Sequence, residues 1–308
     1  MAIQPIAEVF GFPPDNTSEE AQRYKRNRLC PFNNKVPNCT KDSVTEPLGV
    51  CSLHSNDSLA VICPVRLRES WLITEHAAAF FFPEGTRWTS LVEVRLNDKN
   101  GKSAGNIDIV VVSYNEQGRV TDFGALEVQT VYISGNLRKN FFKPYMDNSA
   151  AYVGTDWSKS RLKIPRPDYL SSSRKRLAPQ LIFKGGILNT WNRKQAVAVH
   201  SAFYKTLPDL PELPKEQADI VWLVYDLVYY ETLHRYKLTL IRTVYTEFKS
   251  SLDKITLAEA GPIEGFLSNL QAKLDARLKD GADLKTLSDI PEDIPADETD
   301  LFDEINNL

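Results

Sequence analysis

The sequence predicts a mixed α/β body, in which a central mixed sheet is flanked by helices, with a small metal-bound module at its N-terminus. Short apolar runs rich in Val and Ile alternate with amphipathic segments, which is typical of proteins that combine strands and helices. All four cysteines lie in the first 63 of the 308 residues, whereas the final 29 residues hold ten acids and one lysine. We therefore expect a four-cysteine region over residues 1–66, a main domain over 67–279 and a disordered acidic tail over 280–308.

The expected elements follow from local patterns along the chain. Helices are expected where an N-cap or an amphipathic run begins a segment, at residues 18–29, 69–82, 187–207 and 261–279. Strands are expected where apolar residues alternate or form a short β-branched run, at residues 91–96, 106–113, 123–131, 219–230 and 236–248. The last two strands should pair as an antiparallel hairpin. Residues 162–179 are rich in Pro, Ser and basic side chains, which favours a loop.

The composition excludes several classes of protein. With 42% apolar and 25% charged residues, the chain resembles ordinary globular proteins and not collagen, coiled coils or wholly disordered chains. No apolar run approaches the roughly 18 residues that a membrane helix needs. The first residues have neither the basic nor the apolar region of a secretory signal. We therefore expect a cytoplasmic protein with no membrane partner.

The four cysteines have the spacing C-x8-C-x11-C-x11-C, and a turn-forming Pro or Gly lies near three of them. Four clustered thiols in a chain otherwise free of cysteine indicate a metal site, because a thiolate tetrad suits tetrahedral zinc or iron. Four thiolates would complete the coordination sphere, so the metal would be structural. Buried free thiols and disulfides are the alternatives. The candidate ligands are Cys30, Cys39, Cys51 and Cys63.

Two acidic residues lie inside otherwise apolar predicted strands, Asp108 in NIDIV and Glu127 in LEVQ. Burying an unpaired carboxylate is costly, so an acid in such a position usually has a cation or a strong donor as its partner. If the two strands pair as a hairpin, the two carboxylates converge near one end. Together with the backbone carbonyl of Val128, they would form the kind of oxygen site that Mg²⁺ prefers.

Gln129 extends this arrangement to D-x(n)-E-x-Q, which resembles the D…(D/E)-x-K signature of PD-(D/E)XK nucleases. Side chains two residues apart on a strand share a face, so Glu127 and Gln129 should point the same way. A neutral amide can orient the attacking water but supplies no positive charge where the signature has lysine. Glu93, on the preceding predicted strand, is a further candidate acid. The alternative is a pair of strand-end acids bound to lysines.

The central part of the chain is strongly basic. Residues 134–205 hold fourteen basic and three acidic side chains, a net charge of +11. This asymmetry indicates a polyanionic partner such as double-stranded DNA, with salt-dependent binding, although a solvated basic surface is the alternative. Arg or Lys reads G·C pairs through guanine O6 and N7. The candidate DNA-binding residues are Arg161, Lys163, Arg166, Arg174, Lys175 and Arg176.

Several segments together resemble the NotI-type restriction endonucleases. The matching segments are residues 6–11 (IAEVFG), 30–32, 39–41, 49–51, 62–64 and 124–130 (GALEVQT). Residues 181–184, 191–203 and 221–227 match more loosely. The resemblance therefore extends to about residue 248 and leaves out the acidic tail.

The resemblance implies a type II restriction endonuclease, a hydrolase of restriction–modification that acts as a homodimer with a PD-(D/E)XK core. It implies Mg²⁺-dependent double-strand cuts in a GC-rich palindromic DNA site. Two departures are visible: the loop between Asp108 and Glu127 has its own length, and the match at Glu93 rests on spacing alone. The implied iron ligands are Cys30, Cys39, Cys51 and Cys63, and the implied active-site residues are Glu93, Asp108, Glu127 and Gln129.

Two other functions fit part of the sequence. A non-catalytic DNA-binding protein with a four-cysteine zinc or iron module would explain the thiols and the basic residues, but not the acids on core strands. A repair or structure-specific nuclease on the same core would share the carboxylates. Discrete double-strand fragments with uniform ends would separate a restriction endonuclease from both.

Overall fold

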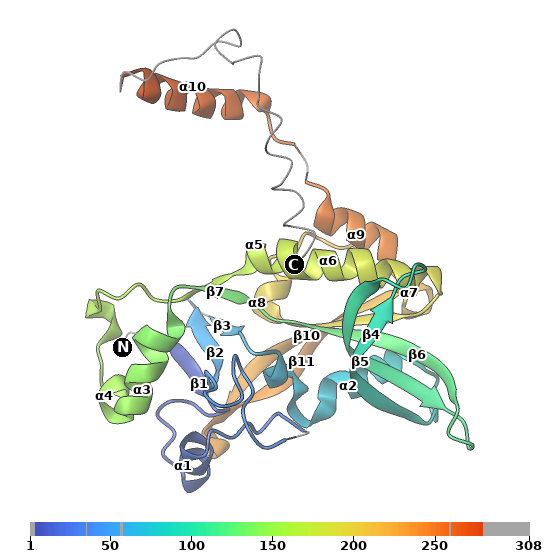
Figure 1. Cartoon of the computed structure of the whole chain (residues 1–308), viewed down its shortest axis with the longest axis horizontal. Helices are drawn as coiled ribbons and strands as arrows, with labels where there is room; N and C mark the ends of the chain where they lie inside the picture. Colours follow the sequence, from blue (N-terminus) through green and yellow to red (C-terminus); the bar gives the residue numbers. More distant parts are fainter. Residues whose placement is uncertain (1–3, 35, 56–57, 259, 280–308) are drawn as a thin grey trace, which may run out of the picture. The chain divides into compact units, whose positions relative to one another are not determined.

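The computed structural model of the chain describes residues 4–34, 36–55, 58–258 and 260–279 (Figure 1). The chain divides into two compact units, Met1–Leu257 and Ala258–Leu308. In its described part, the second unit contains the helix α10 (Ile263–Lys279), which corresponds to the helix predicted there. The predicted acidic tail, residues 280–308, lies outside the described residues. Within the described ranges, no helix has both the length and the apolar character needed to cross a bilayer.

A six-stranded mixed sheet forms the centre of the first unit. Its strands are β4 (Trp88–Asn97), β5 (Ser103–Tyr114), β6 (Val120–Gln129), β9 (Gln195–His200), β10 (Ile220–Tyr230) and β11 (Arg235–Thr246). Their order across the sheet is β11-β10-β9-β6-β5-β4. The central strands β6, β9 and β10 are parallel, whereas the pairs β4–β5, β5–β6 and β10–β11 are antiparallel. The predicted hairpin of residues 219–248 is therefore confirmed.

Helices cover both faces of this sheet. Helix α2 (Leu72–Phe81) packs on one face, where Ile73, Ala77 and Phe81 share a buried core with β5, β6, β9 and β10. On the other face, a helical run over residues 169–190 packs with α9 (Phe248–Thr256), as Figure 1 shows. Leu177 and Leu181 of this run contribute to a second core, which also holds residues of β9 and β10. The predicted α/β fold, a mixed sheet flanked by helices, is confirmed.

The remaining elements surround these layers. The other helices are α1 (Glu19–Arg26), α3 (Lys143–Asp147), α4 (Ser149–Val153) and α8 (Ser201–Tyr204), with 3₁₀ turns at η1 (Pro64–Trp71), η3 (Trp157–Lys159), η6 (Lys215–Gln217) and η7 (Glu231–Leu233) and a π turn at η2 (Arg138–Phe142). A three-stranded antiparallel sheet contains β1 (Ile6–Val9), β2 (Val50–Ser55) and β3 (Ser58–Val61). A two-stranded sheet pairs β7 (Tyr132–Ser134) with β8 (Arg166–Asp168).

The prediction of a loop over residues 162–179 is wrong for residues 169–179, which are helical. The helical run consists of α5 (Tyr169–Ser172), η4 (Ser173–Leu177), α6 (Ala178–Gln180), η5 (Leu181–Gly185) and α7 (Gly186–Thr190). Pro179 lies in the short α6, between two π turns. Wide turns of this kind change the hydrogen-bond pattern where a proline lacks its N–H. Burial of the leucines stabilises the run despite this proline.

The helix expected over residues 187–207 is also wrong, because its middle is strand β9. All six residues of β9 are buried, and the strand lies between β6 and β10 at the centre of the sheet. Parallel strands covered on both faces read as continuous apolar runs, and periodicity cannot distinguish such a run from a buried helix. Residues 187–190 remain helical in α7, and residues 201–204 form α8.

Candidate functional site

The strands β5 and β6 separate at the residues that carry the predicted acids. Their pairing runs from the turn of the hairpin to the pair Ile109 and Leu126, and stops there. Asp108 and Glu127 occupy the next opposing positions, where the two strands part. The structure brings these two side chains close, since Asp108 accepts a hydrogen bond from the N–H of Val128, the residue after Glu127, and its charge raises the pKa of Glu127. Two acids therefore meet at a fork in the sheet.

Backbone donation holds Asp108 in place. The backbone N–H of Val128 donates a hydrogen bond of 2.8 Å to Oδ2 of Asp108. The half-buried Asp108 carboxylate thus replaces a strand carbonyl as the acceptor for this N–H at the fork. This bond orients the carboxylate toward β6, which carries Glu127.

Glu127 is buried and its two oxygens differ. Oε2 accepts a hydrogen bond of 2.7 Å from Nζ of Lys184, whereas Oε1 accepts none from any residue that the structure describes. Burial, together with the charge of the Asp108 carboxylate, raises the pKa of Glu127 to about 8 despite the opposing charge of Lys184. Two acids with one nearby ammonium are short of positive charge in an environment of low polarity.

The donor chemistry of this pair fits a hard divalent cation. Carboxylate oxygens are the ligands that Mg²⁺ prefers, and Mg²⁺ commonly binds through only one or two carboxylates while keeping several waters. Oε1 of Glu127 is buried and free of protein donors within the described chain, and the Glu127 side chain interacts with Asp108. A bound cation would compensate both charges and would offset the burial and the like charge that raise the pKa of Glu127.

Lys184 is the residue of this site that the sequence analysis did not assign to it. It lies on η5, in the helical run of residues 169–190. The sequence predicted a loop up to residue 179 and a helix from residue 187, so Lys184 fell between the two. Its side chain is 5% exposed, and Nζ donates both to Glu127 and to the carbonyl of Asn106 at 2.8 Å. The sequence holds one signal for it, because Lys184 follows three apolar residues in a segment that resembles the restriction endonucleases.

The other two predicted active-site residues lie near the fork but are not bonded to its acids. Gln129 is buried on the strand of Glu127, and its Nε2 donates to the carbonyl of Thr130. Glu93 occupies the β4 position that faces Asp108 in the register, but it is exposed and has a left-handed φ of 55°. In the described parts of the chain, no three His, Cys, Asp or Glu side chains form a group that could hold a metal, so Glu93 does not complete a triad of acids.

The four cysteines are free thiols in one region of the first unit. Cys39, Cys51 and Cys63 are buried and Cys30 is half-buried. Burial raises the pKa of each thiol, and Cys30 reaches about 12. The disulfide alternative is therefore not what the structure contains. Although the thiols lie near enough to raise one another's pKa, they too form no metal-binding group among the described residues.

Backbone N–H groups are directed at three of these sulfurs. Cys30 accepts from the N–H groups of Phe32 and Asn33, and Cys63 accepts from those of Val65 and Arg66. Cys39 accepts in the same way, from the N–H groups of residues 41 and 49. These donors favour a thiolate over a thiol, because hydrogen bonds to the charged form lower the pKa.

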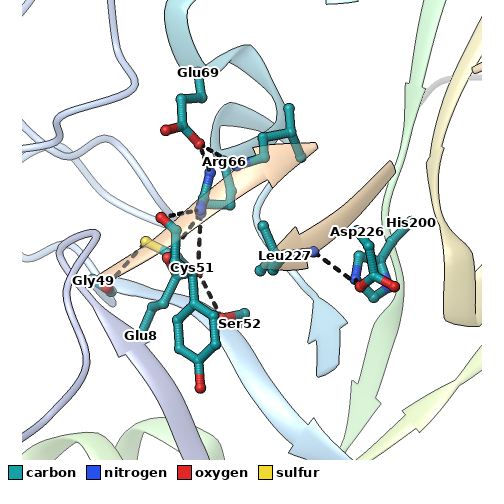
Figure 2. Close-up of polar contacts among 11 residues, drawn as sticks. Glu8, Gly49, Cys51, Ser52, Arg66, Glu69, His200, Asp226 and Leu227 are labelled. Atoms are coloured by element: carbon teal, nitrogen blue, oxygen red, sulfur yellow. Dashed lines mark hydrogen bonds and ion pairs between the residues drawn. The ribbon is translucent and has the colours of Figure 1, made fainter. Parts of the chain in front are cut away.

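A buried ion network lies beside Cys51. Figure 2 shows Arg66 between Glu8 and Glu69. Nε of Arg66 donates to both oxygens of Glu8 at 2.9 Å, and Nη1 donates to Glu69 at 2.7 Å. The hydroxyl of Ser52 donates a third hydrogen bond to Glu8, at 2.7 Å. Glu8 and Arg66 are fully buried, so this network joins β1, β2 and η1 as one packed body.

A second polar pair in Figure 2 joins β9 to β10. Nε2 of His200 lies 3.0 Å from Oδ1 of Asp226, and this contact with His200 lowers the pKa of Asp226. Alternation along β9 sets His200 on the face opposite to Val197, the residue that pairs with Glu127. The pair is therefore separate from the carboxylate fork.

The predicted DNA-binding residues are exposed and lie on three consecutive segments. Arg161 and Lys163 precede β8, and Arg166 begins it. The three basic residues 174–176 lie on η4, in the helical run that also carries Lys184. The guanidinium of Arg176 stacks 3.9 Å from the ring centre of Tyr132. One run of helix thus connects an exposed basic surface with the carboxylate fork.

Comparison with known proteins identifies the family. The family model described as "Restriction endonuclease NotI" matches residues 16–238, which is more than half of the chain. This range contains the four cysteines, the two acids of the fork and Lys184. Among curated proteins, none matches the chain. The chain therefore belongs to the NotI restriction endonuclease family and is a type II restriction endonuclease, a site-specific deoxyribonuclease that acts on double-stranded DNA.

Proposed function

We propose that this enzyme cuts both strands of a GC-rich palindromic site in a Mg²⁺-dependent reaction, at a PD-(D/E)XK core centred on Asp108 and Glu127. The observation that carries the proposal is the buried Oε1 of Glu127, which accepts no hydrogen bond from the described residues although its side chain interacts with a second carboxylate, that of Asp108. Buried acids usually have donors. An acid pair without enough of them is the chemistry that binds a hard cation.

Each residue has a distinct part in the proposed reaction. Asp108 and Glu127 would hold the cation, and the carbonyl of Val128 would be a third oxygen ligand. When bound, Mg²⁺ neutralises the acid pair and stabilises the charge that develops on the phosphate. Gln129 shares the face of Glu127 and orients the attacking water through its amide. Glu93 approaches the same site from β4 as a further acid.

DNA recognition depends on the basic residues and on symmetry. A homodimer with a two-fold axis presents the same surface to each half-site, so its target is a palindrome. The exposed basic side chains on β8 and η4 contact phosphates, and some of these side chains donate to guanine O6 and N7 in the major groove. Binding should therefore weaken steeply as the salt concentration rises.

The four cysteines form a separate proposal. We propose that Cys30, Cys39, Cys51 and Cys63 bind a structural iron or zinc ion. The support is the donor set: four free thiols in one region, three of which accept backbone hydrogen bonds. Metal analysis of protein purified without added metal should give one iron or zinc per chain. Less than a tenth of an equivalent, with normal folding of Cys51→Ser, would contradict this assignment.

The experiment for the cutting reaction uses plasmid DNA. Purified enzyme is incubated with plasmid in Mg²⁺ and in EDTA, and the ends of the fragments are sequenced. We expect discrete fragments with uniform ends in Mg²⁺ only. Intact DNA under both conditions would favour a non-catalytic binder, whereas nicks or irregular ends would favour a repair or structure-specific nuclease.

The Asp108→Asn variant tests the residues in the same assay. Asparagine can still accept from the N–H of Val128, so the fold is retained while one carboxylate is lost. We expect DNA binding to remain and cleavage to disappear. The control is Asp122→Asn, which changes an acid at the other end of β6, where it pairs with Arg193. Equal cleavage by Asp108→Asn and the wild type would overturn the site.

A further inference from the structure

The position two residues after Glu127 is where the nuclease signature has its lysine, and this chain has Gln129 there. The amide of Gln129 is buried, neutral and bonded to the carbonyl of Thr130. It therefore adds no positive charge to the two acids at the fork. Any compensating charge supplied by the protein must come from another element.

Lys184 brings an ammonium to this place from a distant part of the chain. Its Nζ lies 2.7 Å from Oε2 of Glu127 and 2.8 Å from the carbonyl of Asn106, the residue two positions before Asp108. It thus contacts both strands of the fork. Of the basic side chains in the described residues, Lys184 is the one that forms an ion pair with Glu127.

The packing around Lys184 fixes this position. Gly105 has a left-handed φ of 109°, and a Cβ there would lie 3.7 Å from Cδ of Lys184, so the lysine stem lies along the backbone of β5. The next residue, Gly185, accepts a hydrogen bond from Nε2 of Gln195 at the start of β9. A Cβ on Gly185 would lie only 2.8 Å from the ring of Phe248. Close packing at Gly105 and at Gly185 therefore restricts where the side chain of Lys184 can lie.

We infer that Lys184 takes the role of the absent signature lysine, and that its ammonium orients Glu127 so that Oε1 faces Asp108. We treat Lys184 as a positioning residue, because it acts through its contacts with Glu127 and the carbonyl of Asn106. The inference rests on the proposed cutting site and adds a residue to it from a different element. A lysine that merely neutralises a buried acid would support folding alone, so the test must separate these roles.

The test moves the lysine back to the strand. Three variants are compared with the wild type in single-turnover plasmid cleavage, in DNA binding and in thermal unfolding: Lys184→Gln, Lys184→Arg, and Lys184→Gln combined with Gln129→Lys. We expect Lys184→Gln to lower the cleavage rate constant about 100-fold while DNA affinity changes less than about threefold. Lys184→Arg and the double variant should each recover at least about tenfold of that loss, because both restore a cation beside Glu127.

Several outcomes would overturn the inference. Cleavage by folded Lys184→Gln within about twofold of the wild type would show that the ammonium is dispensable. A double variant that folds and binds DNA but cuts no faster than Lys184→Gln would do the same. If Lys184→Gln fails to fold, the double variant decides alone: folded and active supports the role, folded and inactive contradicts it.

Two controls separate this inference from the proposed site. Lys194→Gln changes a lysine that donates to the carbonyl of Phe80 on the α2 face, and it should cut normally. Asp108→Asn tests the site itself. If Asp108→Asn cuts normally, the proposed site is wrong; if it is inactive while Lys184→Gln is active, only the role of Lys184 is wrong.

Discussion

Glu8 and Glu127 are both buried carboxylates that face a cation, yet their surroundings differ. Both oxygens of Glu8 accept from Arg66, and Oε2 accepts from Ser52 as well. Glu127 has one oxygen bonded to Lys184, while its other oxygen is buried without a donor from the described chain, and the charge of Asp108 acts on the same side chain. Both acids are inside the protein, so burial alone does not distinguish them.

The two acids differ in whether both carboxylate oxygens have hydrogen-bond donors. A fully bonded buried ion pair fixes how its elements pack, because removing either partner leaves an uncompensated charge. An acid with an open oxygen and a like-charged neighbour has a raised pKa and an unmet need for a cation, which is typical of functional sites. The Glu8 network is therefore structural, and the Glu127 fork is where chemistry is expected.

The largest expected effect separates the two acids by activity. Glu127→Gln should lower the cleavage rate at least about 1000-fold, about 4 kcal/mol of transition-state stabilisation. Its midpoint of thermal unfolding should stay near that of the wild type, because a pKa of about 8 already leaves Glu127 largely protonated at neutral pH, and glutamine keeps an oxygen for Lys184. Single-turnover cleavage and calorimetry measure both quantities. If Glu127→Gln loses activity only because it unfolds, the claim that Glu127 serves activity and Glu8 serves stability would be contradicted.

The second expected effect is on stability. Glu8→Gln should lower the free energy of unfolding by about 3 kcal/mol or more, because Arg66 stays buried with one charge partner removed. Urea denaturation followed by tryptophan fluorescence measures it. The cleavage rate per folded molecule should be unchanged below the unfolding transition. A stable Glu8→Gln variant that has lost cleavage would reverse the assignment of the two sites.

A smaller effect tests how much the stability depends on each hydrogen bond to Glu8. Ser52→Ala removes one of the donors to Glu8 and should cost roughly 1.5–2 kcal/mol of stability, as expected for a buried hydrogen bond to a charged group. Glu8 keeps its two bonds from Arg66, so the network should survive. The same urea experiment measures the change. A loss of stability as large as that of Glu8→Gln would mean that the bonds from Arg66 do not hold the network once the Ser52 bond is removed.

The sequence was sufficient for the part of the site that local pattern controls. Asp108 and Glu127 interrupt apolar strand runs, and adjacent antiparallel strands are joined by a short turn, so their meeting could be derived from the order of residues. The family resemblance was confirmed by the family model. The helix α2, which ends just before Pro83, and the hairpin of β10 and β11 could also be predicted from their apolar runs.

Lys184 could not be derived in this way. Its contact with Glu127 spans 57 residues of chain. Its position depends on the helical run of residues 169–190, which Pro179 and the polar composition disguise as a loop. It depends also on β9, whose short apolar run reads equally well as a helix. Long-range packing decides these elements, and local sequence carries little of that information.

The most direct test of the central claim is calorimetric titration of Mg²⁺ into the enzyme bound to a duplex with a non-cleavable phosphate at the mapped cut position. The wild type should show saturable Mg²⁺ binding at each fork, and the variants Asp108→Asn and Glu127→Gln should show at least a tenfold weaker affinity, while Glu8→Gln should bind as the wild type does at a temperature where it is folded. Equal Mg²⁺ affinity in the wild type and in both fork variants would contradict the claim that Asp108 and Glu127 hold the metal.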